Sequence, residues 1–244
     1  METLEKITTI GGFVAKDFRT ASVFSKYGID FCWKGNKTIE EVCKAKRINP
    51  NILEQEIATV LGSKNESVID FNSWPLDLLA DYIEKKHHTY VNENAVVLLR
   101  FLKSAGKTYG DNNPQLVVIY ELFKECVQEM TAHMKNEELV LFPFIKKIVN
   151  AAIVDEVIEL SDFKNFESPV DMMLHEHDIE GERFRKIAEL SNNYTPPANS
   201  CNVLKITYAM LKEFEEDLHK HIHLENNILF PKAIQLEKDY SAQF

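Results

Sequence analysis

Apolar residues recur at steps of three and four along most of the chain from residue 75 onward. This spacing gathers them on one face of a helix, and no stretch shows the alternation of a strand. Prolines, glycines and asparagines divide the pattern into long segments. The sequence therefore predicts an all-α fold built on an antiparallel four-helix bundle. The expected helices cover residues 75–104, 114–149, 169–191 and 200–237.

The first sixty residues carry shorter apolar segments, which predict three short helices. The first covers residues 14–26, the second starts after Thr38 in a capping box with Glu41, and the third starts at Pro50. So short a unit has a small core, and we expect it to pack on the larger domain or on a second chain. The predicted division is a helical N-terminal domain over residues 1–62, a linker over 63–73 and the bundle over 74–244.

A short motif occurs twice, in the second and in the fourth predicted helix. His133 and Glu137 form the first copy, His221 and Glu225 form the second, and three residues separate each copy from a Leu-Phe-Pro that follows it. Residues four apart share one face of a helix, and here that face is the apolar one. An imidazole or a carboxylate buried there without a partner would cost several kcal/mol, so the repeat predicts a metal site.

A single histidine precedes each copy of the motif at nearly the same distance. His88 lies 45 residues before His133, and His177 lies 44 residues before His221. The spacing suggests a repeated two-helix unit that directs one further histidine into the interior from the first and the third helix. The apolar stripe of the first helix has its midline between His87 and His88, so periodicity does not choose between these two.

The predicted donor set narrows the choice of metal. Four imidazoles and two carboxylates are too many ligands for one tetrahedral zinc ion and too rich in nitrogen for calcium or magnesium. They fit two iron or manganese ions that share bridging carboxylates and keep a position open for a small ligand. Ligand type alone also admits zinc.

Other histidines and cysteines receive structural interpretations. His175, His219 and His223 each lie two residues from a predicted ligand, so they should point to the other side of their helices, as surface or outer groups. Cys126 lies on the inward stripe and fits a small buried hydrophobic residue. The four cysteines show no CxxC spacing, which argues against a disulfide framework and against a zinc-thiolate site.

Charge and composition restrict the partners. Lys and Arg number 28 against 38 Asp and Glu, a net charge of −10, which disfavours nucleic acid and anionic membranes as main partners. The first residues lack the apolar segment of a signal peptide, and no apolar run is long enough to span a bilayer. A cytoplasmic location is therefore expected.

Several motifs together resemble those of one known family. They are the segment from Phe24 to Cys32, residues 133–143, the Glu-His-Asp at 176–178, and residues 221–231 with their Leu-Glu-Asn-Asn. With them the chain resembles the iron–sulfur cluster repair di-iron proteins, which are hemerythrin-like proteins associated with nitrosative and oxidative stress. The resemblance covers nearly the whole chain and favours His88 over His87. It implies two iron ions held by His88, His133, Glu137, His177, His221 and Glu225.

Two positions depart from the family pattern. Trp33 follows Cys32, where the family commonly has a second cysteine, so a role that needs two adjacent thiols is excluded. Asn92 stands one turn after His88, where some relatives have another histidine. Cys32 stays a candidate thiol for passing on iron or electrons, with a buried structural role as the alternative. Cys43 could substitute for the missing thiol only if the fold brings it near.

The resemblance implies a protein that repairs iron–sulfur clusters damaged by nitrosative or oxidative stress, by donating iron from a labile di-iron centre to the damaged proteins. The alternatives are a hemerythrin-type sensor or carrier of O2 or NO, and an enzyme that reduces nitric oxide at the centre. The cysteine-bearing N-terminal domain argues against a bare carrier, which needs only the bundle. Its small size makes a homodimer plausible.

Overall fold

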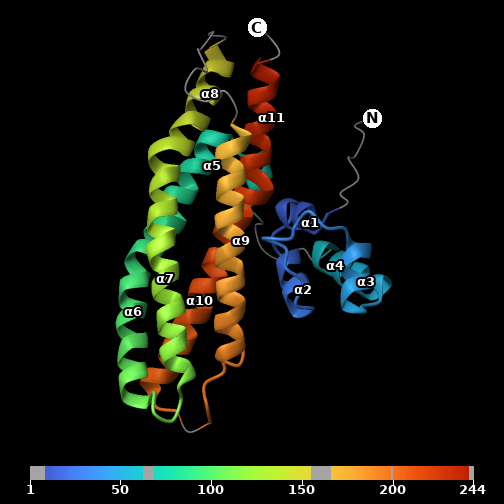
Figure 1. The fold of residues 1–244 in the computed structure, drawn as a ribbon. Coiled ribbons are helices and arrows are strands. Elements are labelled where there is room, and N and C mark those ends of the chain that lie inside the picture. Colours follow the sequence, from blue (N-terminus) through green and yellow to red (C-terminus); the bar gives the residue numbers. More distant parts are fainter. Residues whose placement is uncertain (1–8, 63–68, 155–165, 199, 242–244) are drawn as a thin grey trace.

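The structure is a computed structural model that describes residues 9–62, 69–154, 166–198 and 200–241. Most of these residues are helical, and the described part contains no strand beyond an isolated bridge between Thr9 and Thr38. The prediction of an all-α fold with a helical bundle is confirmed. Figure 1 shows the long helices α6, α7, α9 and α10 as neighbouring rods, with the short helices α1 to α4 against one side.

Four helical rods form the bundle. α6 packs against α7 and α10, and α7 packs against α9. Three of the rods are continuous helices that contain a π turn, labelled η2, η3 or η4. The first and last residues of all four rods lie within about five residues of the helix ends predicted from the sequence. The rods are α5 Leu76–Tyr82, η2 Ile83–His88 and α6 Thr89–Tyr109; α7 Gln115–Asn136, η3 Glu137–Leu141 and α8 Phe142–Val154; α9 Glu167–Leu190; and α10 Asn202–Leu224, η4 Glu225–Leu229 and α11 Phe230–Ser241.

The interior of the bundle consists of two apolar clusters. One includes Leu98, Phe123, Phe184 and Phe214, and the other includes Leu79, Phe142, Met173 and Phe230. Along each rod, the histidines and glutamates predicted as ligands fall where one cluster gives way to the other. The repeated motif therefore forms a polar layer between two apolar ones.

Residues 9–62 contain four helices where three were expected. They are α1 Ile10–Lys16, α2 Thr20–Lys26, α3 Ile39–Lys46 and α4 Pro50–Gly62. The first predicted helix is interrupted at Asp17, whose carboxylate accepts hydrogen bonds from the backbone N–H and the guanidinium of Arg19. This local side-chain bonding competes with helical hydrogen bonding. The capping box of Thr38 and Glu41 is present as predicted.

The segment expected to be a linker is described only in part. The sequence also predicts a weakly helical stretch at 155–162, which lies outside the described residues, and so do residues 63–68. After them a short 3-10 helix, η1 Phe71–Ser73, buries Phe71 against the second apolar cluster. The division at residues 62 and 74 therefore stays a prediction.

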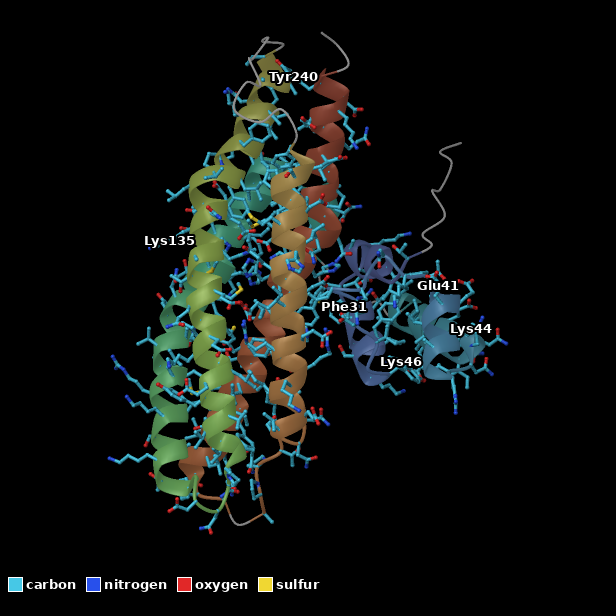
Figure 2. The ribbon with its side chains drawn as sticks, viewed as in Figure 1. Phe31, Glu41, Lys44, Lys46, Lys135 and Tyr240 are labelled. Carbon is cyan, nitrogen blue, oxygen red and sulfur yellow. The ribbon has the colours of Figure 1, made fainter. Side chains whose placement is uncertain are left out.

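The N-terminal helices pack on α9, α10 and η4. Asn227 of η4 reaches between Gly11 and Gly35, where a side chain on either glycine would collide with its amide. The indole of Trp33 lies so close to α9 that a Cβ at Gly181 would be 2.7 Å from the ring. Figure 2 shows Phe31 between the N-terminal helices and the bundle, in agreement with its ring contacts to His219 and His223. Among the described helices, none has the length and apolar character needed to cross a membrane.

Candidate metal centre

The π turns of the bundle coincide with the predicted ligands. η2 ends at His88, η3 begins at Glu137 and η4 begins at Glu225. In η3 and η4 the N–H of Phe142 and that of Phe230 donate to the carbonyl five residues earlier, directly before Pro143 and Pro231. A proline has no N–H to continue the α-helical pattern, so a change of register costs least at this point. The Leu-Phe-Pro segments thus explain why the backbone forms a π turn at the end of each copy of the motif.

All six predicted residues converge in the interior of the bundle. Their side-chain atoms form two groups, and within each group the candidate ligand atoms lie within 4.8 Å of one another. Glu137 and Glu225 belong to both groups, so the arrangement has the form of two ion positions that share two carboxylates. The groups are His88, Glu137, His221 and Glu225, and His133, Glu137, His177 and Glu225.

The imidazole Nε2 atoms point to the two shared carboxylates. Nε2 of His88 and Nε2 of His133 each lie 3.3 Å from an oxygen of Glu137. Nε2 of His177 lies 3.4 Å from one oxygen of Glu225, and Nε2 of His221 lies 2.8 Å from the other. Each carboxylate is therefore flanked by two imidazoles, one from each group.

A bound cation would offset the energetic cost of burying these carboxylates. Glu137 and Glu225 are 0% exposed. Within the described residues, neither oxygen of Glu137 nor Oε2 of Glu225 accepts a hydrogen bond. Buried carboxylates are costly unless they are paired or coordinate a metal, so the donor set fits the binding of metal ions.

The charges of the cluster shift its pKa values in opposite directions. Burial raises the pKa of Glu137, but His133 and His88 outweigh it and hold the pKa well below its usual value. Burial lowers the pKa of His88, but Glu137 and Glu225 outweigh it and raise the pKa to about 10. Burial, together with the nearby His133, lowers the pKa of His177 to about 4. The metal-free cluster therefore keeps protons on some of its imidazoles, and cations would displace them.

In three of the four imidazoles, a side-chain oxygen lies within hydrogen-bonding distance of Nδ1, the ring nitrogen that does not face the shared carboxylates. Nδ1 of His88 lies 2.8 Å from Oε1 of Glu138, and Nδ1 of His133 lies 2.6 Å from Oε2 of Glu176. Nδ1 of His177 lies 2.7 Å from Oδ1 of Asn226. Such acceptors place the proton on Nδ1 and leave Nε2 free to bind a metal.

Sequence reasoning did not assign roles to these three acceptors. A signal was present, because each of Glu138, Glu176 and Asn226 is the direct neighbour of a predicted ligand in the chain.

A cavity of about 480 Å³ lies at the contact between the N-terminal helices and the bundle, beside Cys32 and His219. A second cavity, of about 400 Å³, lies between α7 and α9, and His133 and Glu176 line it together with Met130. The second cavity reaches one edge of the His and Glu cluster and offers a small molecule or an ion a route to it.

Comparison with known families agrees with this geometry. The family described as hemerythrin HHE cation binding domain matches residues 80–233, which include all six residues of the cluster. The chain belongs to the hemerythrin HHE family. A second family, the ScdA N-terminal domain of unknown function, matches residues 6–61. Family and cluster together indicate that this hemerythrin-family protein binds metal.

Relatives of this hemerythrin-family protein align over most of its length. The iron-sulfur cluster repair protein ScdA of Staphylococcus haemolyticus is 29% identical over 87% of this chain and 91% of its own. The iron-sulfur cluster repair protein YtfE of Musicola paradisiaca is 28% identical, over 90% and 92%. The protein of the same name from Escherichia coli O81 is 29% identical, over 88% and 91%.

Cys32, the candidate thiol, is buried at the contact between the N-terminal helices and α10. It is 2% exposed, and its Sγ donates to the carbonyl oxygen of His219 at 3.0 Å. Burial raises the pKa of this thiol well above its usual value. The structure therefore favours the structural role over an exposed relay. Cys43 is buried too, in the apolar cluster that includes the N-terminal helices.

The remaining histidines occupy different environments. His175 is exposed, and His219 is half-buried. The expectation of a surface or outer position is wrong for His223, which is 1% exposed and packs against Phe18 and Phe31. His223 does point away from His221, but the N-terminal helices cover that side of α10.

Proposed function

We propose that the cluster holds two iron ions. In this proposal Glu137 and Glu225 bridge the two positions, His88 and His221 bind one ion, and His133 and His177 bind the other. The observation that carries the proposal is the pair of fully buried carboxylates, each shared by two imidazole groups and left with oxygens that accept no hydrogen bond from the described residues. Neutral imidazoles and bridging carboxylates are ligands that suit iron.

We propose further that the protein restores iron–sulfur clusters damaged by nitrosative or oxidative stress. The support comes from relatives that are named iron-sulfur cluster repair proteins and that align with 87% to 90% of this chain. Damaged iron–sulfur proteins would be the clients, and iron would be the cargo. The chain also carries the matched N-terminal domain, whereas a bare oxygen carrier needs only the bundle.

The residues of the proposed site would allow iron to be released as well as bound. Two bridging carboxylates attract Fe3+ more strongly than Fe2+, because the attraction scales with the charge of the ion. Iron held as Fe2+ would therefore leave more readily than iron held as Fe3+, and the outer acceptors Glu138, Glu176 and Asn226 would keep the imidazoles oriented for binding iron again. The cavity beside His133 supplies a route to solvent.

Reactivation of a cluster enzyme tests this function. An enzyme inactivated by nitric oxide is incubated with the iron-loaded, reduced protein, and we expect its activity to return in proportion to the iron lost from the centre. The His133→Ala variant serves as the control and should restore little activity. Reversible binding of NO or O2 without iron transfer would contradict repair and favour a sensor or carrier, and formation of nitrous oxide would favour a reductase.

A further inference from the structure

One histidine of the centre lacks the outer partner that the other three have. His88, His133 and His177 each have an oxygen acceptor at Nδ1. His221 is 0% exposed, and its Nδ1 has no hydrogen-bond partner among the described residues. Because histidines that bind a metal almost always donate the other ring N–H, this donor calls for an acceptor.

Two rings lie beside His221: that of His88, with its centroid 4.9 Å away, and that of His87. The ring centroids of His87 and His221 are 5.7 Å apart, and the ring planes are 12° from parallel. His87 is 0% exposed, and its Nδ1 lies 3.0 and 3.1 Å from the two oxygens of Asp217 on α10. Its Nε2 is buried without a partner in the described part of the chain.

Two consecutive histidines face the interior in a π turn. Neighbouring residues of a regular α-helix point about 100° apart, and the wider turn of a π-helix brings their directions closer together. η2 ends at His88, and within it both His87 and His88 are buried. His88 thereby reaches the carboxylates while His87 reaches His221.

The protons of these rings can be assigned from their partners. A carboxylate only accepts hydrogen bonds, so the Asp217 side requires the proton of His87 on Nδ1 and leaves a lone pair on Nε2. Once Nε2 of His221 binds an ion beside Glu225, as proposed above, the ring proton of His221 must lie on Nδ1. One ring thus has a donor without an acceptor, and the adjacent ring has an acceptor without a donor.

We propose that His87, held by Asp217, is the positioning residue of His221. It accepts the Nδ1–H of His221 through one water molecule, and so fixes the orientation of that imidazole and increases its basicity. The inference rests on the proposed role of His221 as an iron ligand. It adds that only one of the two ions, the one bound by His88 and His221, depends on His87.

The test measures iron release from the loaded full-length protein to a ferrous chelator. In His87→Phe the aromatic ring stays and the acceptor is lost. We expect one of the two irons to leave about 10 to 100 times faster, with the other unchanged. His87→Gln, whose side-chain oxygen can accept the same hydrogen bond, should restore most of the slow release. His175→Gln, at an exposed histidine, is the matched control and should behave like the parent chain.

Two further measurements separate positioning from packing. Asp217→Asn keeps the shape of the side chain and weakens the acceptor, so it should accelerate the same iron by a smaller factor, and it serves if His87→Phe does not fold. Mössbauer spectra of the 57Fe-loaded variants should show a change in one iron environment only. Equal acceleration of both irons, or no rescue by glutamine, overturns the proposal. A parent chain that binds no iron overturns the proposed function instead.

Discussion

Two buried regions of this molecule contain reactive side chains, and they differ in how their polar atoms are paired. At the metal centre, Glu137 and Glu225 have oxygens that accept no hydrogen bond from the described residues. At the N-terminal contact, the Cys32 thiol donates to a carbonyl, and Asp30 accepts from the backbone N–H groups of Cys32 and Trp33. The comparison teaches that burial alone does not identify a site. At the centre the unpaired atoms belong to carboxylates gathered with imidazoles, which is the arrangement that a cation would complete.

The two regions also depend on different parts of the sequence. The centre is built from a motif that occurs twice and from two single histidines, and it needs four helices to assemble. The Cys32 region depends on close packing, where Trp33 of the N-terminal region meets Gly181 of α9. If the comparison is right, substitutions in one region should alter iron binding, and substitutions in the other should alter packing and thiol reactivity.

The largest effect is expected from Glu137→Gln. Because Glu137 is shared by both groups, its loss should lower the iron content from about two ions per chain to less than about one. Elemental analysis after anaerobic reconstitution measures this. Glu138→Gln, at the adjacent residue, keeps an acceptor for His88 and should retain both ions. Cys32→Ser should retain both as well, and a loss of iron in that variant would break the distinction between the two regions.

The pH dependence of iron affinity gives the next effect. In the metal-free protein Glu137 and Glu225 outweigh burial and raise the pKa of His88 to about 10, so this imidazole must lose a proton before an ion binds. The apparent affinity should therefore increase by about tenfold per pH unit below that pKa, or about 100-fold from pH 6.5 to 8.5. Competition with a chelator of known affinity measures it. An affinity that is flat over this range would contradict the assignment of protons.

Gly181→Ala should disturb the N-terminal contact with little effect on iron. The added Cβ would meet the Trp33 indole at 2.7 Å, and such overpacking typically costs about 1 to 3 kcal/mol. The rate at which Cys32 reacts with a thiol reagent should therefore rise about tenfold or more. The matched control is Gly106→Ala on α6, where the nearest atom to a Cβ is 3.8 Å away. Equal thiol reactivity in the two variants would show that Trp33 does not hold this contact.

The smallest effect is expected at Glu215, which lines the cavity beside Cys32. Burial raises the pKa of Glu215 to about 7. Since the folded state then binds the proton more tightly than the unfolded state, stability should fall as the pH rises from about 5 to 8, by about 1 to 2 kcal/mol. In Glu215→Gln the stability should no longer fall over this pH range. In Glu216→Gln, at the exposed neighbour, it should fall as in the parent chain. Denaturant unfolding at several pH values measures the difference.

Much of the fold and of the candidate site could be predicted from the chain. The helical spacing predicted the four rods, because it extends over many turns. The repeated His and Glu pairs, with the family resemblance, pointed to the six residues that the structure brings together. Asp17 was missed as a break, since its hydrogen bonds to Arg19 are a local alternative to the helix and leave the apolar spacing almost unchanged.

Two other features could not be predicted from periodicity. Periodicity did not choose between His87 and His88 because both side chains are buried, within a π turn that apolar spacing does not reveal. His223 was placed on the correct side of α10, but the covering helices come from a distant part of the sequence. Periodicity within one helix carries no information about what packs on its outer face.

X-ray absorption at the iron edge tests the central claim most directly, because it reports both the ligands and the neighbouring metal. For the reconstituted chain we predict a first shell of nitrogen and oxygen only, with a second iron at about 3.5 to 4 Å or somewhat closer through the carboxylate bridges. Sulfur in the first shell, or a single isolated iron, would contradict the account.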